Sequence, residues 1–280
     1  QIDWLKAIAS RVPYSSDTVL TVHDPAMAIA QALQLGFAER VVHPLGDVIA
    51  VPDKEVSAVN YLRNNVLHAY ALPALVANLL IALREVTPER VAEFAEGGLP
   101  FLRAELMLHH SPAEAIAVSQ RIVELFVELG LARTGTDGQL RAADRYSPEH
   151  AGLELLARSL RHLLRRNYLT IALLTRVGSG TLTRQRLEEL MQMLTQRLSL
   201  LFEFAPPDFY ERSTFASYID TLLETGLVHE HADGSLRLHE HTRTWERYVE
   251  RLLPADAVLA IRRVAVEQAP PAAPAEKREG

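Results

Sequence analysis

The chain has 280 residues, of which 48% are hydrophobic and 23% charged, with a formal net charge of −6 and no cysteine. This balance excludes a mainly disordered chain, and the acidic charge argues against a nucleic-acid-binding domain, which is usually basic. The absence of cysteine excludes disulfides, thiolate zinc sites and cysteine nucleophiles. Because the chain begins at Gln1 without a signal peptide and exceeds one typical helical domain, we expect a piece of a longer protein with several subdomains.

The first quarter of the chain predicts helices, one hairpin and a long apolar segment. Amphipathic stretches predict helices over 2–12 and 25–35, and two β-branched runs around Pro44–Asp47 predict a hairpin over 39–51. A helical segment then runs from residue 53 to 83, and we expect Pro73 either to kink it or to break it into a pair of helices.

Residues 64–83 of this segment carry no charge. Twenty helical residues span roughly 30 Å, which is enough to cross a bilayer. Asn65, His68 and Asn78 lie within the stretch, however, and such polar groups are costly in lipid. We therefore expect a buried helix pair or a segment lying at the membrane surface rather than a transmembrane span.

Three later helices share one start signal, a hydroxyl residue followed by proline. It occurs at Thr87-Pro88, Ser111-Pro112 and Ser147-Pro148, and only the second has the glutamate, Glu114, that completes a capping box. The signals predict helices over 88–95, 112–129 and 148–176, and the apolar periodicity predicts further helices over 184–203, 213–225 and 240–252.

An internal repeat with an offset of 96 residues links two of these regions. Glu128, Gly130, Leu131 and Asp137-Gly138 recur as Glu224, Gly226, Leu227 and Asp233-Gly234. Each copy reads as a helix, a glycine stop, and two strands around an Asp-Gly turn. We expect a mainly α fold of helical subdomains with small β-hairpins and two winged-helix-like units. The expected divisions are a helical region with one hairpin over 1–86, a winged-helix-like unit over 87–146, a helical unit with the second wing over 147–266, and a disordered tail over 267–280.

The helices before each hairpin are acidic, which argues against DNA binding through a winged helix. The second hairpin carries His229, His231, His239 and His241. A two-residue Asp233-Gly234 loop would place the first two histidines away from His239, whereas a longer loop would change this register. We therefore expect solvent-exposed histidines here and no metal site.

Two polar groups are candidates for binding. Tyr61, Asn65 and His68 share one face at helical spacing, beside Arg63 and Asn64. They form either a structural hydrogen-bond network or a contact with a substrate or a neighbouring domain.

The second candidate group is basic. Arg158, Arg161 and Arg165 follow one another at helical spacing along a single face. They form either a solvated face or a contact with anionic lipid or an acidic protein.

Several short runs occur together in a characteristic order. They are Val12-Pro13-Tyr14-Ser15, Gly46-Asp47-Val48-Ile49, Tyr61-Leu62-Arg63-Asn64-Asn65-Val66-Leu67-His68, Leu102-Arg103-Ala104-Glu105-Leu106, Gln196-Arg197-Leu198-Ser199 and Glu240-His241-Thr242. On these runs, residues 1–265 resemble the C-terminal region of the bacterial membrane-bound glycerol-3-phosphate acyltransferases.

The resemblance implies a peripheral enzyme on the cytoplasmic face of the bacterial inner membrane. Such an enzyme transfers a fatty acyl group from acyl-CoA or acyl-carrier protein to the 1-hydroxyl of glycerol 3-phosphate. The family's catalytic histidine stands five residues before an aspartate, and none of the eleven histidines here does; the family's Pro-Glu-Gly-Thr-Arg block is missing as well.

The resemblance therefore implies a non-catalytic region without catalytic residue, metal or cofactor. Its partners would be the N-terminal acyltransferase domain of the parent, the acyl donor through that domain, and the membrane surface, with no nucleic acid. The alternative is a free-standing winged-helix module with an interaction or regulatory role.

Overall fold

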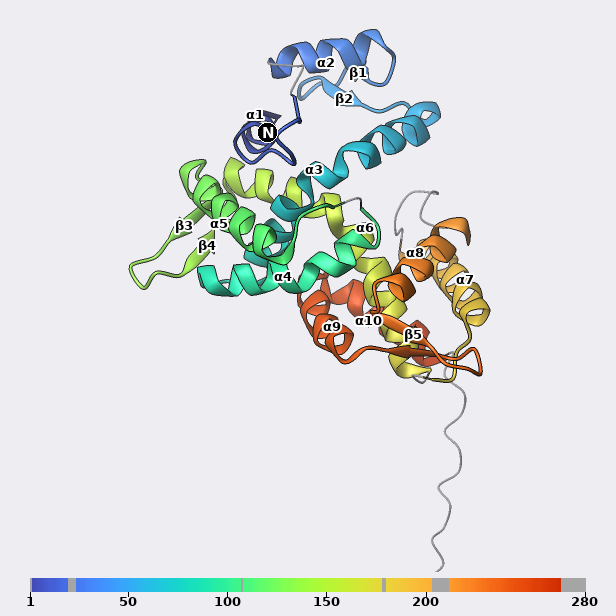
Figure 1. The fold of residues 1–280 in the computed structure, drawn as a ribbon. Helices are drawn as coiled ribbons and strands as arrows, with labels where there is room; N and C mark the ends of the chain where they lie inside the picture. The colour runs from blue at the N-terminus through green and yellow to red at the C-terminus, as the bar shows by residue number, and fades with distance from the viewer. Residues whose placement is uncertain (1, 20–23, 107, 178–179, 203–211, 268–280) are drawn as a thin grey trace, which may run out of the picture. The chain divides into compact units, whose positions relative to one another are not determined.

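The computed structural model describes residues 2–19, 24–106, 108–177, 180–202 and 212–267 (Figure 1). These residues group into two compact units, 1–163 and 164–280, where the sequence suggested three folded units. The boundary falls inside a long helix, α6 (Pro148–Arg176), rather than in a loop. The predicted tail lies outside the described residues from residue 268 onward.

The first unit is helical with two small hairpins, which confirms the predicted fold class. Its elements are α1 (Ile2–Arg11), α2 (Pro25–Gln34), β1 (Glu39–Val41), β2 (Val48–Ala50), a 3-10 turn (Asp53–Glu55), α3 (Val56–Ala82), α4 (Pro88–Arg103), α5 (Pro112–Glu128), β3 (Ala132–Thr134), β4 (Leu140–Ala142) and the first part of α6. Each hairpin is a two-stranded antiparallel sheet.

All three predicted hydroxyl caps are present. The Thr87 hydroxyl accepts a hydrogen bond from the Arg90 backbone N–H at 3.2 Å, and the Ser147 hydroxyl accepts one from the His150 N–H at 3.1 Å. At Ser111 the capping box is complete, because Glu114 also accepts from the Ser111 N–H at 2.7 Å. These side chains satisfy donors that the first turn of a helix leaves open.

The apolar segment is one continuous helix, α3, so Pro73 does not break it into two. Proline removes the N–H that would reach the carbonyl of residue 69, at a cost of about 3 kcal/mol in a helix interior. Residues 71–80 are buried without exception. Each fully buried Leu or Val side chain contributes roughly 1.5–3 kcal/mol, so several of them outweigh the loss at Pro73.

The second half of the same helix is buried inside the protein. The segment Asp53–Ala82 is long and apolar enough to cross a bilayer, but 61% of its apolar window is buried inside the protein. It packs against α1, α4 and α5, and the Asn78 amide donates to the carbonyls of Ala74 and Ala157, each at 2.8 Å. This half of α3 is therefore the core helix of the first unit.

The second unit repeats the architecture of α4 to β4, as the offset of 96 residues predicted. Its elements are the end of α6, α7 (Arg184–Phe202), α8 (Arg212–Glu224), β5 (Val228–Glu230), β6 (Leu236–Leu238), α9 (Glu240–Leu252) and α10 (Ala255–Glu267).

A backbone contact before each helix pair extends the repeat beyond the residues that suggested it. Val86 exchanges two backbone hydrogen bonds with Leu140, and the Leu182 carbonyl accepts one from the Leu236 N–H. Both pairs keep the offset of 96. In each unit, the segment just before the two helices (α4 and α5, or α7 and α8) is therefore hydrogen-bonded to the second strand of the hairpin that follows them.

Two helices differ from their predicted extents. Helix α4 continues through Gly97, Gly98 and Pro100 to Arg103, beyond its predicted end near residue 95. Helix α10 was not predicted, although Ala257, Ile261 and Ala265 recur every four residues and are buried. Within the second unit, Arg262 on α10 donates to the Tyr168 hydroxyl at 2.9 Å and pairs with Glu250 on α9.

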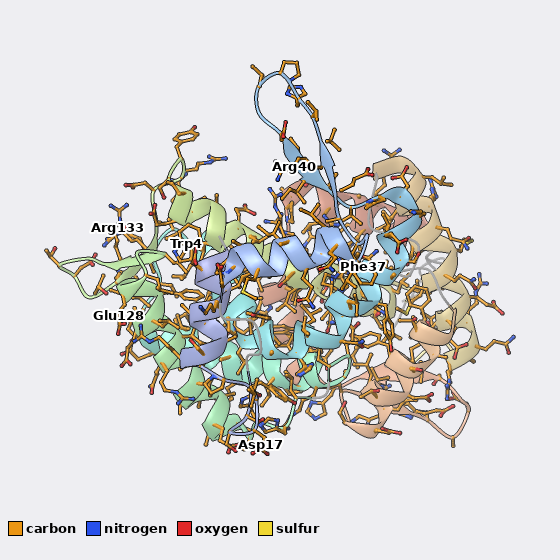
Figure 2. The ribbon with its side chains drawn as sticks, turned by 90° about the horizontal axis from the view of Figure 1, so that it is seen from above. Trp4, Asp17, Phe37, Arg40, Glu128 and Arg133 are labelled. Atoms are coloured by element: carbon orange, nitrogen blue, oxygen red, sulfur yellow. The ribbon has the colours of Figure 1, made fainter. Side chains whose placement is uncertain are left out.

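Gly152 on α6 touches the ring of Trp4 on α1 so closely that a Cβ at this position would overlap the ring (Trp4 is labelled in Figure 2). Gly97 on α4 has nothing within 4 Å of the same position. Exchange of a helical glycine for alanine ordinarily stabilises by roughly 0.5–1 kcal/mol.

We therefore expect Gly97→Ala to raise the free energy of unfolding by about that amount and Gly152→Ala to lower it by about 1–3 kcal/mol through overpacking. Urea unfolding of the two variants beside the parent chain measures both effects. A stabilised Gly152→Ala chain would contradict the contact between α1 and α6.

Candidate functional site

The predicted polar group on α3 occupies the half of the helix that precedes the buried run. Tyr61 is 67% exposed, and Asn64 and Asn65 are exposed as well. Arg63 donates to the neighbouring Asn64 side chain at 3.0 Å. No hydrogen bond joins Tyr61, Asn65 and His68 to one another within the described residues, so these three do not form the network that one interpretation expected.

His68 contacts a residue that the site prediction did not include. Its ring lies against the ring of Tyr14 in an edge arrangement, with centroids 4.5 Å apart. Tyr14 follows α1, and that helix is held to α3 by a 3.3 Å hydrogen bond from the Tyr70 hydroxyl to the Leu5 carbonyl. The contact between α1 and α3 therefore brings the Val12–Ser15 run against the Tyr61–His68 run.

Two more histidines complete an aromatic cluster around Tyr14. The rings of His109 and His110 lie 4.4 Å and 5.7 Å from the Tyr14 ring, both edge-on. The two imidazoles stack on each other at 4.7 Å. Arg103, at the end of α4, donates to the carbonyl of His110 and so fixes the short segment that carries both histidines.

A cavity of about 330 Å³ opens beside this cluster. Its polar lining comes from the segment after α1 and from α5 with the turn before it: Ser15, Ser16, His109, His110, Glu114 and Arg121. The hydroxyls, the imidazoles and the guanidinium can hydrogen-bond a polar ligand or a partner's backbone. We call Tyr14, His68, His109, His110 and this cavity the Tyr14 site.

Electrostatics at the Tyr14 site favour an uncharged His110. Burial lowers the pKa of His110 from its ordinary value, and the neighbouring His109 and the guanidinium groups of Arg103 and Arg121 lower it further. Glu114 acts in the opposite direction on His110. The pKa of Glu114 is itself lowered, mainly by the hydrogen bond from the Ser111 backbone N–H.

The site does not contain an acid–base pair of the family type. His109 stands five residues before Glu114, which is the family spacing with glutamate in place of aspartate. The Glu114 carboxylate, however, is held by the Ser111 N–H at the start of α5, and no hydrogen bond joins it to His109 in the described structure. Its role here is helix capping.

Tyr14, His109 and His110 were missed as site residues because no single sequence pattern connects them with His68. Tyr14 belongs to the Val12–Ser15 run, and the two histidines follow the Leu102–Leu106 run. Both runs carried the family resemblance. The one available signal was that the Val12–Ser15, Tyr61–His68 and Leu102–Leu106 runs all resemble the same family, which suggests that they lie close together in the fold.

The three predicted basic residues lie on α6. Arg158 and Arg161 both pair with Glu154, at 3.4 Å and 2.7 Å, and the Arg161 side chain is only 22% exposed. Glu154 therefore reduces the positive charge available on this face. A contact with an anionic partner through Arg158, Arg161 and Arg165 stays a prediction.

The second hairpin corrects the predicted histidine register. Val228 pairs with Leu238 and His229 with Arg237, because the His231 N–H bonds to the Ser235 carbonyl and closes a three-residue loop rather than a two-residue one. His229 thereby comes within 5.6 Å of His239, ring to ring, whereas we expected them apart. No group of three or more metal-ligating side chains is found among the described residues.

Comparison with known proteins tests the family resemblance of the short sequence runs. A family model described as the glycerol-3-phosphate acyltransferase C-terminal region matches residues 1–231. The chain belongs to this family. The matched range includes the whole Tyr14 site, and the resemblance seen in the short runs is thereby confirmed.

Curated relatives share the same name. The chain is 34% identical over 279 residues to the glycerol-3-phosphate acyltransferase of Pseudomonas paraeruginosa, which covers 99% of this chain and 33% of that protein. It is 32% identical to the Pseudomonas fluorescens protein over 273 residues, which are 97% of this chain and 33% of that protein. It is also 32% identical to the Pseudomonas putida protein over 268 residues, which are 95% of this chain and 32% of that protein. The chain thus spans about a third of the length of the curated relatives it matches.

The lowered pKa of His110 generates a prediction for pH dependence. In the unfolded chain, His110 takes up a proton near the ordinary pKa of about 6.5. In the folded chain, burial disfavours the protonated form. Stability from this group is therefore complete above that pH and is lost as the pH falls through it.

We expect the free energy of unfolding to decrease between pH 7.5 and 5.5, and His110→Gln to flatten this slope. Urea titrations across that range measure it. The parent chain, measured at the same pH values, is the reference. An unchanged slope in His110→Gln would contradict the prediction.

Proposed function

We propose that this chain is the non-catalytic C-terminal region of a glycerol-3-phosphate 1-O-acyltransferase. The observation that carries the proposal is the match of residues 1–231 to that region's family model, together with relatives that are about three times as long. In the reaction, the 1-hydroxyl oxygen of glycerol 3-phosphate attacks the thioester carbonyl of acyl-CoA or acyl-carrier protein. An ester forms, the thiol leaves, and the hydroxyl proton passes to a base.

The base belongs, in this proposal, to an acyltransferase domain of the longer protein. The chain supplies no histidine with an aspartate five residues on, and the glutamate that stands there after His109 is held in a helix cap. The region would support the acyltransferase domain mechanically. The fully buried half of α3 and the two repeated helix-and-hairpin units suit a rigid support.

We place the longer protein at the cytoplasmic face of the bacterial inner membrane as a peripheral enzyme. The family resemblance motivates this location. The apolar helix of the chain does not add to it, since most of its apolar window is buried in the first unit.

The exposed half of α3 is proposed as a contact with the acyltransferase domain or its substrate. Tyr61 presents a large aromatic side chain to solvent, next to the amides of Asn64 and Asn65 and the guanidinium of Arg63. An exposed aromatic residue flanked by hydrogen-bonding groups is typical of interface anchors. His68 joins this surface to the Tyr14 site.

A second function, an interaction module without an enzyme parent, is favoured by one observation. The two repeated units each combine a helix pair with a bridged hairpin, which is the plan of a winged helix. In this alternative the same surfaces would bind a separate regulatory partner.

The deciding experiment measures acyl transfer to labelled glycerol 3-phosphate, with membrane lipid and both acyl donors supplied. We expect no transfer by the 280-residue chain alone and transfer by the product of the whole reading frame. Transfer by the lone chain would place the catalytic site among these residues. No transfer by either protein would favour the interaction module.

Tyr61→Ala tests the contact role of the exposed half of α3. We expect the variant to lower acyl transfer by the longer protein by roughly tenfold, which is the loss of about 1.4 kcal/mol typical of an interface anchor. The unfolding free energy of the 280-residue chain should stay within about 0.5 kcal/mol of the parent, because the side chain is exposed.

Tyr146→Ala, at a tyrosine that is 97% exposed, is the matched control and should change neither quantity. Equal activity of the two variants would remove Tyr61 from the proposed contact.

A further inference from the structure

The exposed apolar side chains of the described residues are concentrated near the start of the chain. Of the 19 large hydrophobic residues that are exposed, nine lie between Val19 and Val51. Six of them lie on the first hairpin, and together we call them the hairpin surface: Val41 (44% exposed), Val42 (81%), Leu45 (92%), Val48 (54%), Ile49 (46%) and Val51 (42%).

The hairpin surface is unusual because neither face of the hairpin is covered. Val41 pairs with Val48 on one face, and Arg40 pairs with Ile49 on the other. Every residue of β1 is exposed, and helix α2 beside it has no buried residue. Figure 2 marks the hairpin by Arg40.

Such a hairpin needs a partner for stability. A two-stranded sheet alone is at best marginally stable in water and requires further strands or packing on an apolar face. The tip nevertheless has defined geometry, since the Gly46 N–H donates to the His43 carbonyl at 2.9 Å and the Leu45 N–H donates to His43 Nδ1 at 3.2 Å. An ordered apolar tip without a core is typical of a surface that is buried in a larger assembly.

The charged residues around the hairpin help to decide whether a lipid or a protein surface covers it. Residues 39–55 hold four acidic residues, Glu39, Asp47, Asp53 and Glu55, against two basic ones. Anionic lipid attracts clusters of lysine and arginine. The hairpin itself carries one arginine, Arg40, which pairs with Asp47, so it offers no basic cluster to a bacterial membrane surface. An apolar protein surface fits the hairpin surface better.

We infer that the hairpin surface docks onto the part of the longer acyltransferase that lies outside this chain. The inference rests on the proposed function, because it takes the matched relatives, of which this chain covers about a third, as the plan of the whole protein. The occupant is thus a polypeptide surface of the acyltransferase domain, and the hairpin lies within the range that the family model matches.

Hydrogen exchange tests the docking directly. The amides of residues 39–51 are compared in the 280-residue chain and in the product of the whole reading frame, each without lipid and with vesicles of phosphatidylethanolamine and phosphatidylglycerol. We expect exchange to be slowed roughly tenfold or more in the longer protein without lipid. Residues 132–142 form the second hairpin of the first unit, β3 and β4. They are the internal reference and should exchange equally in both proteins.

Three outcomes would overturn the inference. Equal exchange of residues 39–51 in both proteins means that the surface stays free. Protection that appears only with vesicles assigns it to lipid. Protection that appears in the short chain as its concentration rises assigns it to a second copy of the same chain.

A variant adds a functional readout in the longer protein. Val42→Ser with Leu45→Ser should restore fast exchange to residues 39–51 and reduce acyl transfer, whereas Leu259→Ser, at an exposed leucine of α10 (65%), should do neither. Both changes lie at exposed positions, so the chain's own core is not disturbed. If the parent longer protein transfers no acyl group, the proposed function fails while the exchange comparison still reports docking; if it transfers normally without protection of the hairpin, only the docking inference fails.

Discussion

The first unit depends on one constraint, which is that residues 71–80 of α3 are apolar on every side except for Asn78. A helix with apolar residues all round must be enclosed by other elements, and α1, α4 and α5 pack against it. Asn78 remains in this core because its amide donates to two carbonyls, which removes the penalty of burying a polar group. This enclosure also brings the segments after α1 and after α4 to the start of the buried run, next to His68.

The Tyr14 site is therefore a consequence of core packing rather than of local motifs. Tyr14 reaches His68 because α1 lies along α3, and His109 and His110 reach Tyr14 because the turn between α4 and α5 is held by Arg103 and by the Ser111 capping box. Burial at this junction lowers the pKa of His110. The lowered pKa favours the neutral form of the His110 imidazole, which can then both donate and accept a hydrogen bond.

Local chemistry made much of the fold predictable, and its failures have local causes. The three hydroxyl caps, the hairpins and the 96-residue repeat follow from short-range signals that the structure retains. Pro73 does not break α3, and the burial gained around it cannot be read from neighbouring residues. The histidine register of the second hairpin failed by one residue, because Asp233-Gly234 fits both a two-residue loop and the three-residue loop that forms. Of the candidate site, His68 could be proposed from spacing, whereas its partners depend on contacts between helices far apart in sequence.

Helix α3 also separates two kinds of surface along one axis. Its second half is enclosed by the chain itself, while its first half carries Tyr61 and follows directly after the hairpin surface. A sequence under selection for solubility alone would not keep Val42 and Leu45 exposed on an uncovered hairpin next to an exposed tyrosine. The arrangement is economical if residues 39–66 face another domain: the buried half of α3 then anchors the region, and the half before it supplies the contact. None of residues 39–51 is buried, and the hairpin carries no basic cluster, so this stretch fits a protein neighbour better than anionic lipid.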